Sequence, residues 1–177
     1  MKAVALLLAA FLLSTLTASS EPPSADQVLA QAEAKAMAEH KAIFVHFGAS
    51  WCGWCRRLDA FLDRADIKAV FERYFVPVKL VVQENEKNKE LENPGGEALL
   101  EKLGGPSGLP YSAFLNAHGE LIVNSKRPSS AGGGENIGFP VQTEEVDWFV
   151  EMMRKAAPKM SDDDLKTIEA ALRSPKK

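Results

Sequence analysis

Residues 42–48 (AIFVHFG) are a short run of branched and aromatic side chains that is apolar on both alternating faces, except at His46. A strand with one wet face would alternate apolar and polar residues, so this pattern is typical of a strand buried on both sides. Cys52 and Cys55 follow after a short turn, and a helical pattern begins with them. The run therefore indicates an α/β fold whose sheet is covered on both faces.

The rest of the chain gives the order of the other elements. Further strands are predicted over residues 75–82, 110–116 and 120–124, the last two joined by a hairpin at 117–119. Gly- and Pro-rich residues 125–142 are predicted to form a long surface loop. Helices are predicted over residues 25–40, 52–64, 67–71, 97–103, 144–157 and 162–173. The order predicts a three-layer α/β/α sandwich with a small mixed four-stranded sheet and a C-terminal helical extension over residues 158–177.

The overall composition restricts the class of protein. A chain of 177 residues, 46% of them hydrophobic, suits one globular domain better than two. The net charge is −3, and no segment gathers enough Lys and Arg to form a nucleic-acid surface. Nucleic-acid binding is therefore excluded as a function class.

Residues 1–20 have the three-part layout of a secretory signal peptide. Lys2 precedes an apolar run over residues 3–13, and small and polar residues lead to a cleavage position near Ser20. The apolar run is shorter than the roughly 20 residues that span a bilayer. An uncleaved membrane anchor is the alternative. We expect export to the periplasm or beyond, with residues 21–177 as the folded domain.

The cysteine count bears directly on chemistry. Cys52 and Cys55 are the chain's two cysteines, and in an exported protein such a pair can be oxidised. A disulfide across two intervening residues closes almost no loop, so structural stapling explains it poorly. A zinc site generally needs four ligands, and the two cysteines with His46 fall short of that number. No metal site is expected.

The segment Trp51-Cys52-Gly53-Trp54-Cys55 follows a buried strand and opens a helix. In this context it resembles the active-site motif of the thioredoxin superfamily. Leu109-Pro110, just before a strand, resembles the cis-proline of that superfamily, and Val78-Lys79-Leu80 resembles its strand with a lysine below the active site. The order and spacing of elements match over residues 25–157. The resemblance implies a thioredoxin-like fold and a thiol–disulfide oxidoreductase that uses no bound cofactor.

The resemblance also assigns roles to residues. Cys52 is expected to attack a substrate disulfide, because the helix N-terminus favours its thiolate by about 0.3–2 kcal/mol. Cys55 lies one helical turn further on the same face and is expected to resolve the mixed disulfide. Substrate binding is expected from the residues around the pair and before the later strand: Trp51, Gly53, Trp54, Leu109 and Pro110.

Two further residues are candidates for proton transfer. His46 lies six residues before Cys52, where thioredoxin relatives often carry a buried acid. A histidine there can accept the proton of Cys55, since imidazole exchanges protons near neutral pH. The alternative is a core histidine bonded to the backbone. Lys79 either pairs with a group under the site or is an exposed strand lysine.

Together these features predict an exported oxidoreductase that exchanges disulfides with protein substrates through a Cys52–Cys55 cycle. A redox partner protein, which could be membrane-bound, must supply or remove electrons, and the chain is expected to be a monomer. Whether it acts as reductase, oxidase or isomerase stays open. Two other classes also stay open: a non-catalytic binding or chaperone module, and a metal carrier that uses the CxxC motif.

Overall fold

The computed structural model describes residues 21–105, 108–129 and 133–174. Its main sheet has four strands in the order β2-β1-β3-β4, with β1 parallel to β2 and antiparallel to β3. The strands are β1 (Ala42–Gly48), β2 (Phe75–Val81), β3 (Tyr111–Leu115) and β4 (Leu121–Asn124). All seven residues of β1 are buried between these neighbours and the helices, as the pattern of residues 42–48 predicted.

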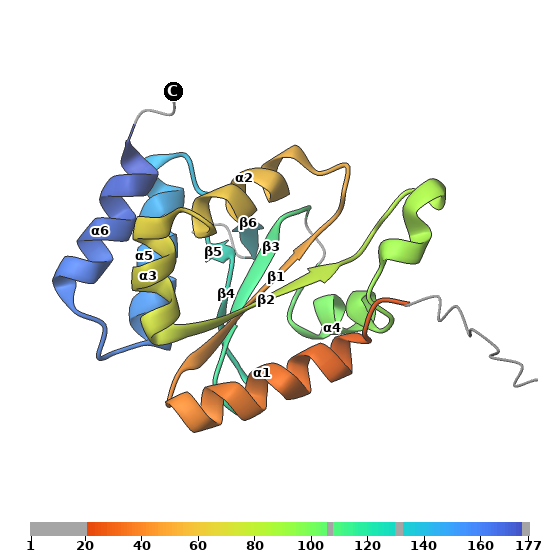
Figure 1. Ribbon diagram of the computed structural model, residues 1–177. Helices are drawn as coiled ribbons and strands as arrows, with labels where there is room; N and C mark the ends of the chain where they lie inside the picture. The colour runs from red at the N-terminus through yellow and green to blue at the C-terminus, as the bar shows by residue number, and fades with distance from the viewer. Residues whose placement is uncertain (1–20, 106–107, 130–132, 175–177) are drawn as a thin grey trace, which may run out of the picture.

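Helices cover both faces of this sheet (Figure 1). On one face α1 (Ala25–Glu39) and α4 (Gly96–Lys102) pack over Ile43, Val45 and Phe47 of β1. On the other face lie α2 (Gly53–Leu62), α3 (Ala65–Tyr74), α5 (Thr143–Ala156) and α6 (Asp162–Arg173). Their apolar sides meet Phe44 and Phe114. The predicted three-layer α/β/α sandwich with a mixed four-stranded sheet is therefore confirmed.

Local sequence explains where α1 begins. The Ser24 side chain accepts from the Gln27 backbone N–H, and the Gln27 side chain accepts from the Ser24 N–H in return. This capping box satisfies two amide groups that the helix cannot pair internally. The Ala25 N–H also donates to Pro94 O, so the start of α1 is tied to the loop before α4.

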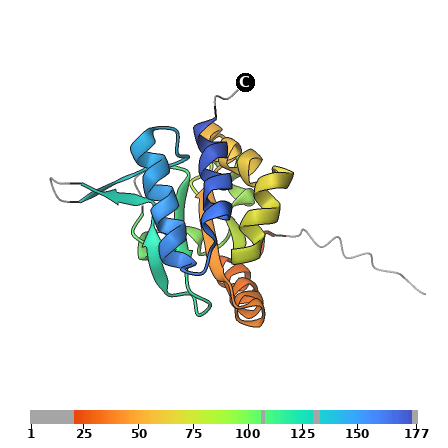
Figure 2. The same cartoon turned by 90° about the vertical axis from the view of Figure 1, so that its left-hand side faces the viewer.

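The C-terminal helix belongs to the main core. α6 buries Leu165, Ile168 and Leu172 in the same apolar cluster as α3 and α5, and it lies beside α5 (Figures 1 and 2). Tyr74 of α3 donates its hydroxyl to the Asp164 carboxylate at 2.6 Å. The predicted helix over residues 162–173 is present, and it completes one face of the sandwich.

The prediction of a surface loop over residues 125–142 was wrong in part. Two strands of three residues, β5 (Lys126–Pro128) and β6 (Gly134–Asn136), pair as an antiparallel hairpin that projects from the body (Figure 2). After it, Ile137 and Phe139 are buried in the core. Residues 130–132 lie outside the described part.

Two other findings complete the description. A 3-10 helical segment, η1 (Glu86–Leu91), was not predicted, because its charged residues carry no apolar periodicity. The predicted signal peptide, residues 1–20, lies outside the described residues. In the described part, no helix has the length and apolar character needed to cross a membrane.

The packing of α6 gives a stability prediction. Replacing Ile168, which is fully buried, by alanine removes core contacts and leaves a cavity, so we expect Ile168→Ala to lower the free energy of unfolding by about 2–4 kcal/mol. Lys166→Ala on the exposed side of the same helix should change it by less than about 0.5 kcal/mol. Urea denaturation followed by circular dichroism measures both. Equal effects would contradict the packing of α6 into the core.

Candidate active site

Cys52 and Cys55 form a disulfide at the point where β1 turns into α2. Cys52 is the N-cap of α2, and its Sγ accepts a hydrogen bond from the Cys55 backbone N–H at 3.1 Å. The two Cα atoms are 5.3 Å apart. Both residues are buried, and Ala49 and Leu109 pack against the disulfide. The Cys52 sulfur therefore occupies the place where a helix N-terminus stabilises negative charge.

The close approach of α2 to β1 depends on the absence of a side chain at Gly48. A Cβ atom at Gly48 would lie 3.2 Å from the Cys55 Cβ and 3.3 Å from its Sγ. These distances are tighter than ordinary contacts. Glycine therefore allows the helix and the strand to approach closely at the disulfide.

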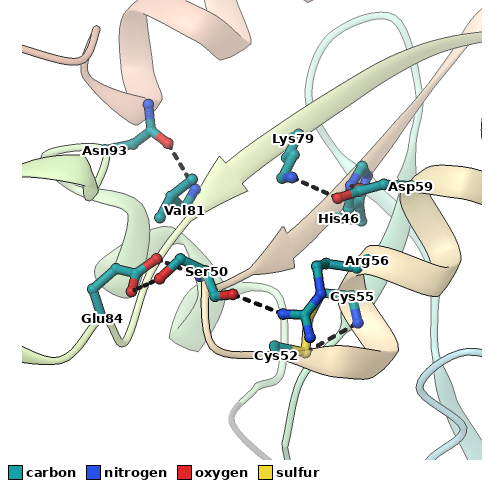
Figure 3. A network of polar contacts seen from close by, with 10 residues as sticks. All are labelled: His46, Ser50, Cys52, Cys55, Arg56, Asp59, Lys79, Val81, Glu84 and Asn93. Carbon is teal, nitrogen blue, oxygen red and sulfur yellow. Dashed lines mark hydrogen bonds and ion pairs between the residues drawn. A yellow bond between two sulfur atoms is a disulfide. The ribbon is translucent and has the colours of Figure 1, made fainter. Parts of the chain in front are cut away.

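One turn further along α2, Asp59 lies against the same face of β1. The His46 Nε2–H donates to Asp59 Oδ1 at 2.9 Å, and Lys79 Nζ donates to Oδ2 at 2.6 Å (Figure 3). The carboxylate thus joins β1 and β2 to α2. Asp59 was not identified from the sequence, although its spacing of four residues from Cys55 places both on one helix face.

Two opposing effects determine the pKa of the Asp59 carboxyl. Burial raises the pKa of the Asp59 carboxyl, but the hydrogen bonds from His46 and Lys79 outweigh burial and hold that pKa below its ordinary value of 3.8. His46 is itself buried, and its Nδ1 has no hydrogen-bond partner among the described residues. A cavity of about 320 Å³ opens beside Asp59 and is lined by His46 and Lys79. The cluster is thus within reach of small solvent molecules.

A second carboxylate holds the turn before Cys52. The buried Glu84 accepts from both the backbone N–H and the hydroxyl of Ser50, the latter at 2.7 Å (Figure 3). Arg56 donates to Ser50 O at 2.8 Å. The turn is thereby fixed to the segment after β2 and to the first turn of α2. No sequence signal identified Glu84, since it lies 34 positions from Ser50.

The structure gathers the predicted substrate-binding residues around the disulfide. The Leu109–Pro110 peptide bond is cis, and Leu109 contacts the cysteine pair. Trp51 and Trp54 are about half exposed, and Trp51 donates its indole N–H to Gln83 O at 2.7 Å. Gly53 is the exposed first residue of α2. Lys79 also lies at the site, where it forms an ion pair with Asp59 and not with a cysteine.

Comparisons with known proteins agree with the fold described above. A family model described as thioredoxin-like matches residues 25–117. A disulphide isomerase from Xylella fastidiosa Temecula1 has a similar solved structure, with a TM-score of 0.50 and 23% sequence identity over 88% of this chain and 95% of that chain. At this level of identity the likeness concerns the fold. No curated protein sequence is significantly similar to this chain.

Two further solved structures are similar at lower scores. The DsbH oxidoreductase has a TM-score of 0.45 and 17% identity over 86% of this chain and 96% of that chain. The C-terminal domain of DsbD from Neisseria meningitidis, in its oxidised form, has a TM-score of 0.42 and 17% identity, covering 75% of this chain and 99% of that domain.

The lowered pKa of Asp59 gives a pH prediction. The unfolded chain protonates this carboxyl near pH 3.8, and the folded chain only at lower pH. The ionised form therefore adds stability above pH 3.8 that is lost as the pH falls through the folded value. At pH 6 we expect the free energy of unfolding of the wild type to be about 1–3 kcal/mol larger than that of Asp59→Asn. This difference in unfolding free energy, the margin, should shrink at pH 3.

Urea denaturation at pH 6, 4 and 3 measures that margin. Asp63→Asn is the control, since Asp63 is the C-cap of the same helix and its exposed carboxylate makes no ion pair with any residue of the described ranges. A margin for Asp59→Asn that stays constant over this range would contradict the assigned role of the ion pairs.

Proposed function

The chain belongs to the thioredoxin-like family, and on this basis we propose that it is a thiol–disulfide oxidoreductase whose redox pair is Cys52 and Cys55. The main support is the disulfide at the N-terminus of α2, with the Cys55 N–H donating to Cys52 Sγ at 3.1 Å. In the reduced protein, this N–H and the helix dipole would favour a thiolate on Cys52 over one on Cys55.

The proposed exchange proceeds in two steps. The Cys52 thiolate attacks one sulfur of a substrate disulfide, forms a mixed disulfide and releases the other substrate sulfur as a thiolate. Cys55 then loses its proton, and its thiolate attacks Cys52 Sγ, which closes the protein disulfide and releases the second substrate thiolate. Two electrons pass to the substrate, and the reverse sequence oxidises a substrate dithiol.

We propose His46 as the acceptor of the Cys55 proton. Because Nε2–H donates to Asp59, Nδ1 is the ring atom left to accept a proton. Cys55 lies over Gly48, two residues from His46 on the same face of β1. Asp59, itself held by Lys79, would stabilise the imidazolium that forms. His46 would thus perform the role expected of a buried acid at this position in relatives.

Partners and location are part of the same proposal. Oxidised or reduced protein must be returned to its starting state by a partner protein, which could be membrane-bound, and the substrates are protein disulfides bound by a monomer. Residues 1–20 would be removed near Ser20 on export to the periplasm or beyond. The chain that remains after such cleavage retains Pro23, whose carbonyl accepts a hydrogen bond from Asn93 at 2.8 Å. It also retains Ser24, the N-cap of α1. Residues 21–177 would act as one domain.

Equilibration with glutathione, followed by thiol trapping, tests this function. We expect one reversible two-electron couple in wild type and none in Cys52→Ser. A reduction potential near or below about −250 mV would indicate a reductase, and one near about −120 to −180 mV an oxidase or isomerase.

The Cys55→Ser variant should accumulate a mixed disulfide with the substrate, because Cys52 can attack but no second cysteine resolves the product. If no reversible disulfide forms, the oxidoreductase function is refuted.

The role of His46 has its own test. His46→Gln keeps a donor for Asp59 but cannot accept a proton, so we expect it to slow resolution of the mixed disulfide by at least about tenfold near pH 7. The defect should disappear above about pH 9, where a thiol ionises without help. Acid-quenched single-turnover reactions measure the rate across pH 6–10. A defect of equal size at every pH would assign His46 a structural role instead.

A further inference from the structure

A groove at the end of the sandwich remote from the cysteines has no part in the exchange chemistry. Its volume is about 570 Å³, and it lies where the end of α1, the start of β1 and the end of α3 meet the β3–β4 turn and the α5–α6 connection. β1 runs from Ala42 in this groove to Gly48 beside the disulfide (Figure 1). A strand of this length spans about 20 Å, so the groove is separate from the redox site.

The walls of this groove are largely apolar. Met37 of α1 and Ile122 of β4 both line it, and they are 47% and 38% exposed. The other apolar residues of the lining have small side chains: Ala36, Ala42, Ala117, Ala156, Ala157 and Pro158. The volume lies within the range of about 300–1,000 Å³ that is typical of small-molecule sites. The exposed apolar walls favour a ligand with an apolar part.

Among the described residues, the charged side chains that line the groove are cations. They are Lys41, Arg73 and Lys159, and no Asp or Glu of the described ranges contributes to the lining, although the whole chain has a net charge of −3. Lys41 is paired with Glu39 and Arg73 with Asp164. The Lys159 ammonium makes no ion pair with any residue of the described ranges. It is therefore available to an anionic ligand.

Two histidines add hydrogen-bond donors to the same groove. His40 is the C-cap of α1, and His118 lies in the β3–β4 turn. Even a neutral imidazole keeps one ring N–H donor. His40 has a φ of 55°, in the left-handed region, which glycine adopts without the steric penalty that a side chain incurs. The chain thus carries an imidazole where the backbone alone favours glycine, as is typical of a side chain with a function.

We propose that this groove is a second binding site, which takes a small organic anion composed of a carboxylate and an apolar chain. The carboxylate accepts hydrogen bonds from the Lys159 ammonium and from the ring N–H groups of His40 and His118. The apolar chain covers the exposed surfaces of Met37 and Ile122. An inorganic anion would leave the apolar walls in contact with water, and an organic cation would be repelled by the lysines and the arginine. A medium-chain fatty carboxylate combines both required features.

Three ligands test the match between groove and ligand. Octanoate has the carboxylate and the chain, acetate has the carboxylate alone, and octylammonium has a chain of the same length with the opposite charge. Isothermal titration calorimetry on the full-length protein gives the dissociation constants. We expect octanoate to bind at least about tenfold more tightly than either of the other two. Absence of octanoate binding, or equal affinity for any two of the three ligands that include octanoate, would overturn the proposal.

A charge reversal locates the carboxylate. Lys159→Glu should weaken octanoate binding about tenfold or more, because it replaces the unpaired ammonium by a repelling carboxylate. Lys87→Glu is the matched control, since Lys87 is also exposed and makes no ion pair in the described part of the chain, but belongs to η1 and lies outside the groove. It changes the net charge equally and should leave the affinity unchanged. Equal losses in the two variants would show that only net charge matters and would contradict the site.

His40→Gly tests the imidazole without a cost in folding. Glycine suits the left-handed conformation, so the variant should unfold at the same temperature as wild type or higher. It should bind octanoate about threefold more weakly, since one donor is lost. Gln83→Gly is the matched control, because Gln83 also has a φ of 55° and lies outside the groove. An unchanged affinity in His40→Gly would remove His40 from the site and contradict the proposal.

The redox pair separates this site from the exchange function. Cys52→Ser should bind octanoate as tightly as wild type does, because β1 lies between the disulfide and the groove. Loss of octanoate binding in this variant would contradict a separate site. If octanoate fails to bind to any form of the protein, the groove is refuted as a ligand site, and the exchange function, which is measured by equilibration with glutathione, is unaffected.

Discussion

The close packing of α2 on β1 is the contact on which the site depends. Gly48 leaves room for the Cys55 side chain, and the register continues along both elements. Four residues of helix rise about 6 Å, nearly the length of two strand residues. The same approach that seats Cys55 over Gly48 therefore seats Asp59 against His46. The absence of a Cβ atom at residue 48 therefore determines the position of the disulfide and of the Asp59 carboxylate with its partners His46 and Lys79.

Two carboxylates near this contact, those of Asp59 and Glu84, each accept two hydrogen bonds. Asp59 receives hydrogen bonds from two elements, and Glu84 receives both donors of Ser50. A buried carboxylate without such partners would be strongly destabilising. The partners also fix the active-site geometry: Asp59 orients the His46 ring, and Glu84 holds the turn that ends at Cys52. Stability and the proposed chemistry thus depend on the same hydrogen bonds.

The segment that contains β5 and β6 and leads to α5 shows how an irregular region is integrated into the fold. Its strands of three residues are too short for a detectable alternation, and its glycines predict only a turn. The segment is nevertheless fixed by the Asn136 amide and by the burial of Ile137 and Phe139. A free surface loop and a segment attached to the core can have the same local composition. They differ in the contacts that they make with residues distant in the sequence, such as the hydrogen bond from Asn136 to Gly108, 28 positions away.

The sequence by itself determined the features that depend on local periodicity and capping. The buried strand at residues 42–48, the cysteine pair that opens α2, the capping box of Ser24 and the amphipathic α6 all follow from patterns within a few residues. Only the tertiary structure decided the partners of those elements. Asp59 lies 13 positions from His46, Glu84 34 from Ser50, and Asn136 26 from Pro110. Such pairs form because helix packing and sheet register bring distant side chains within hydrogen-bonding distance, and no local pattern encodes that register.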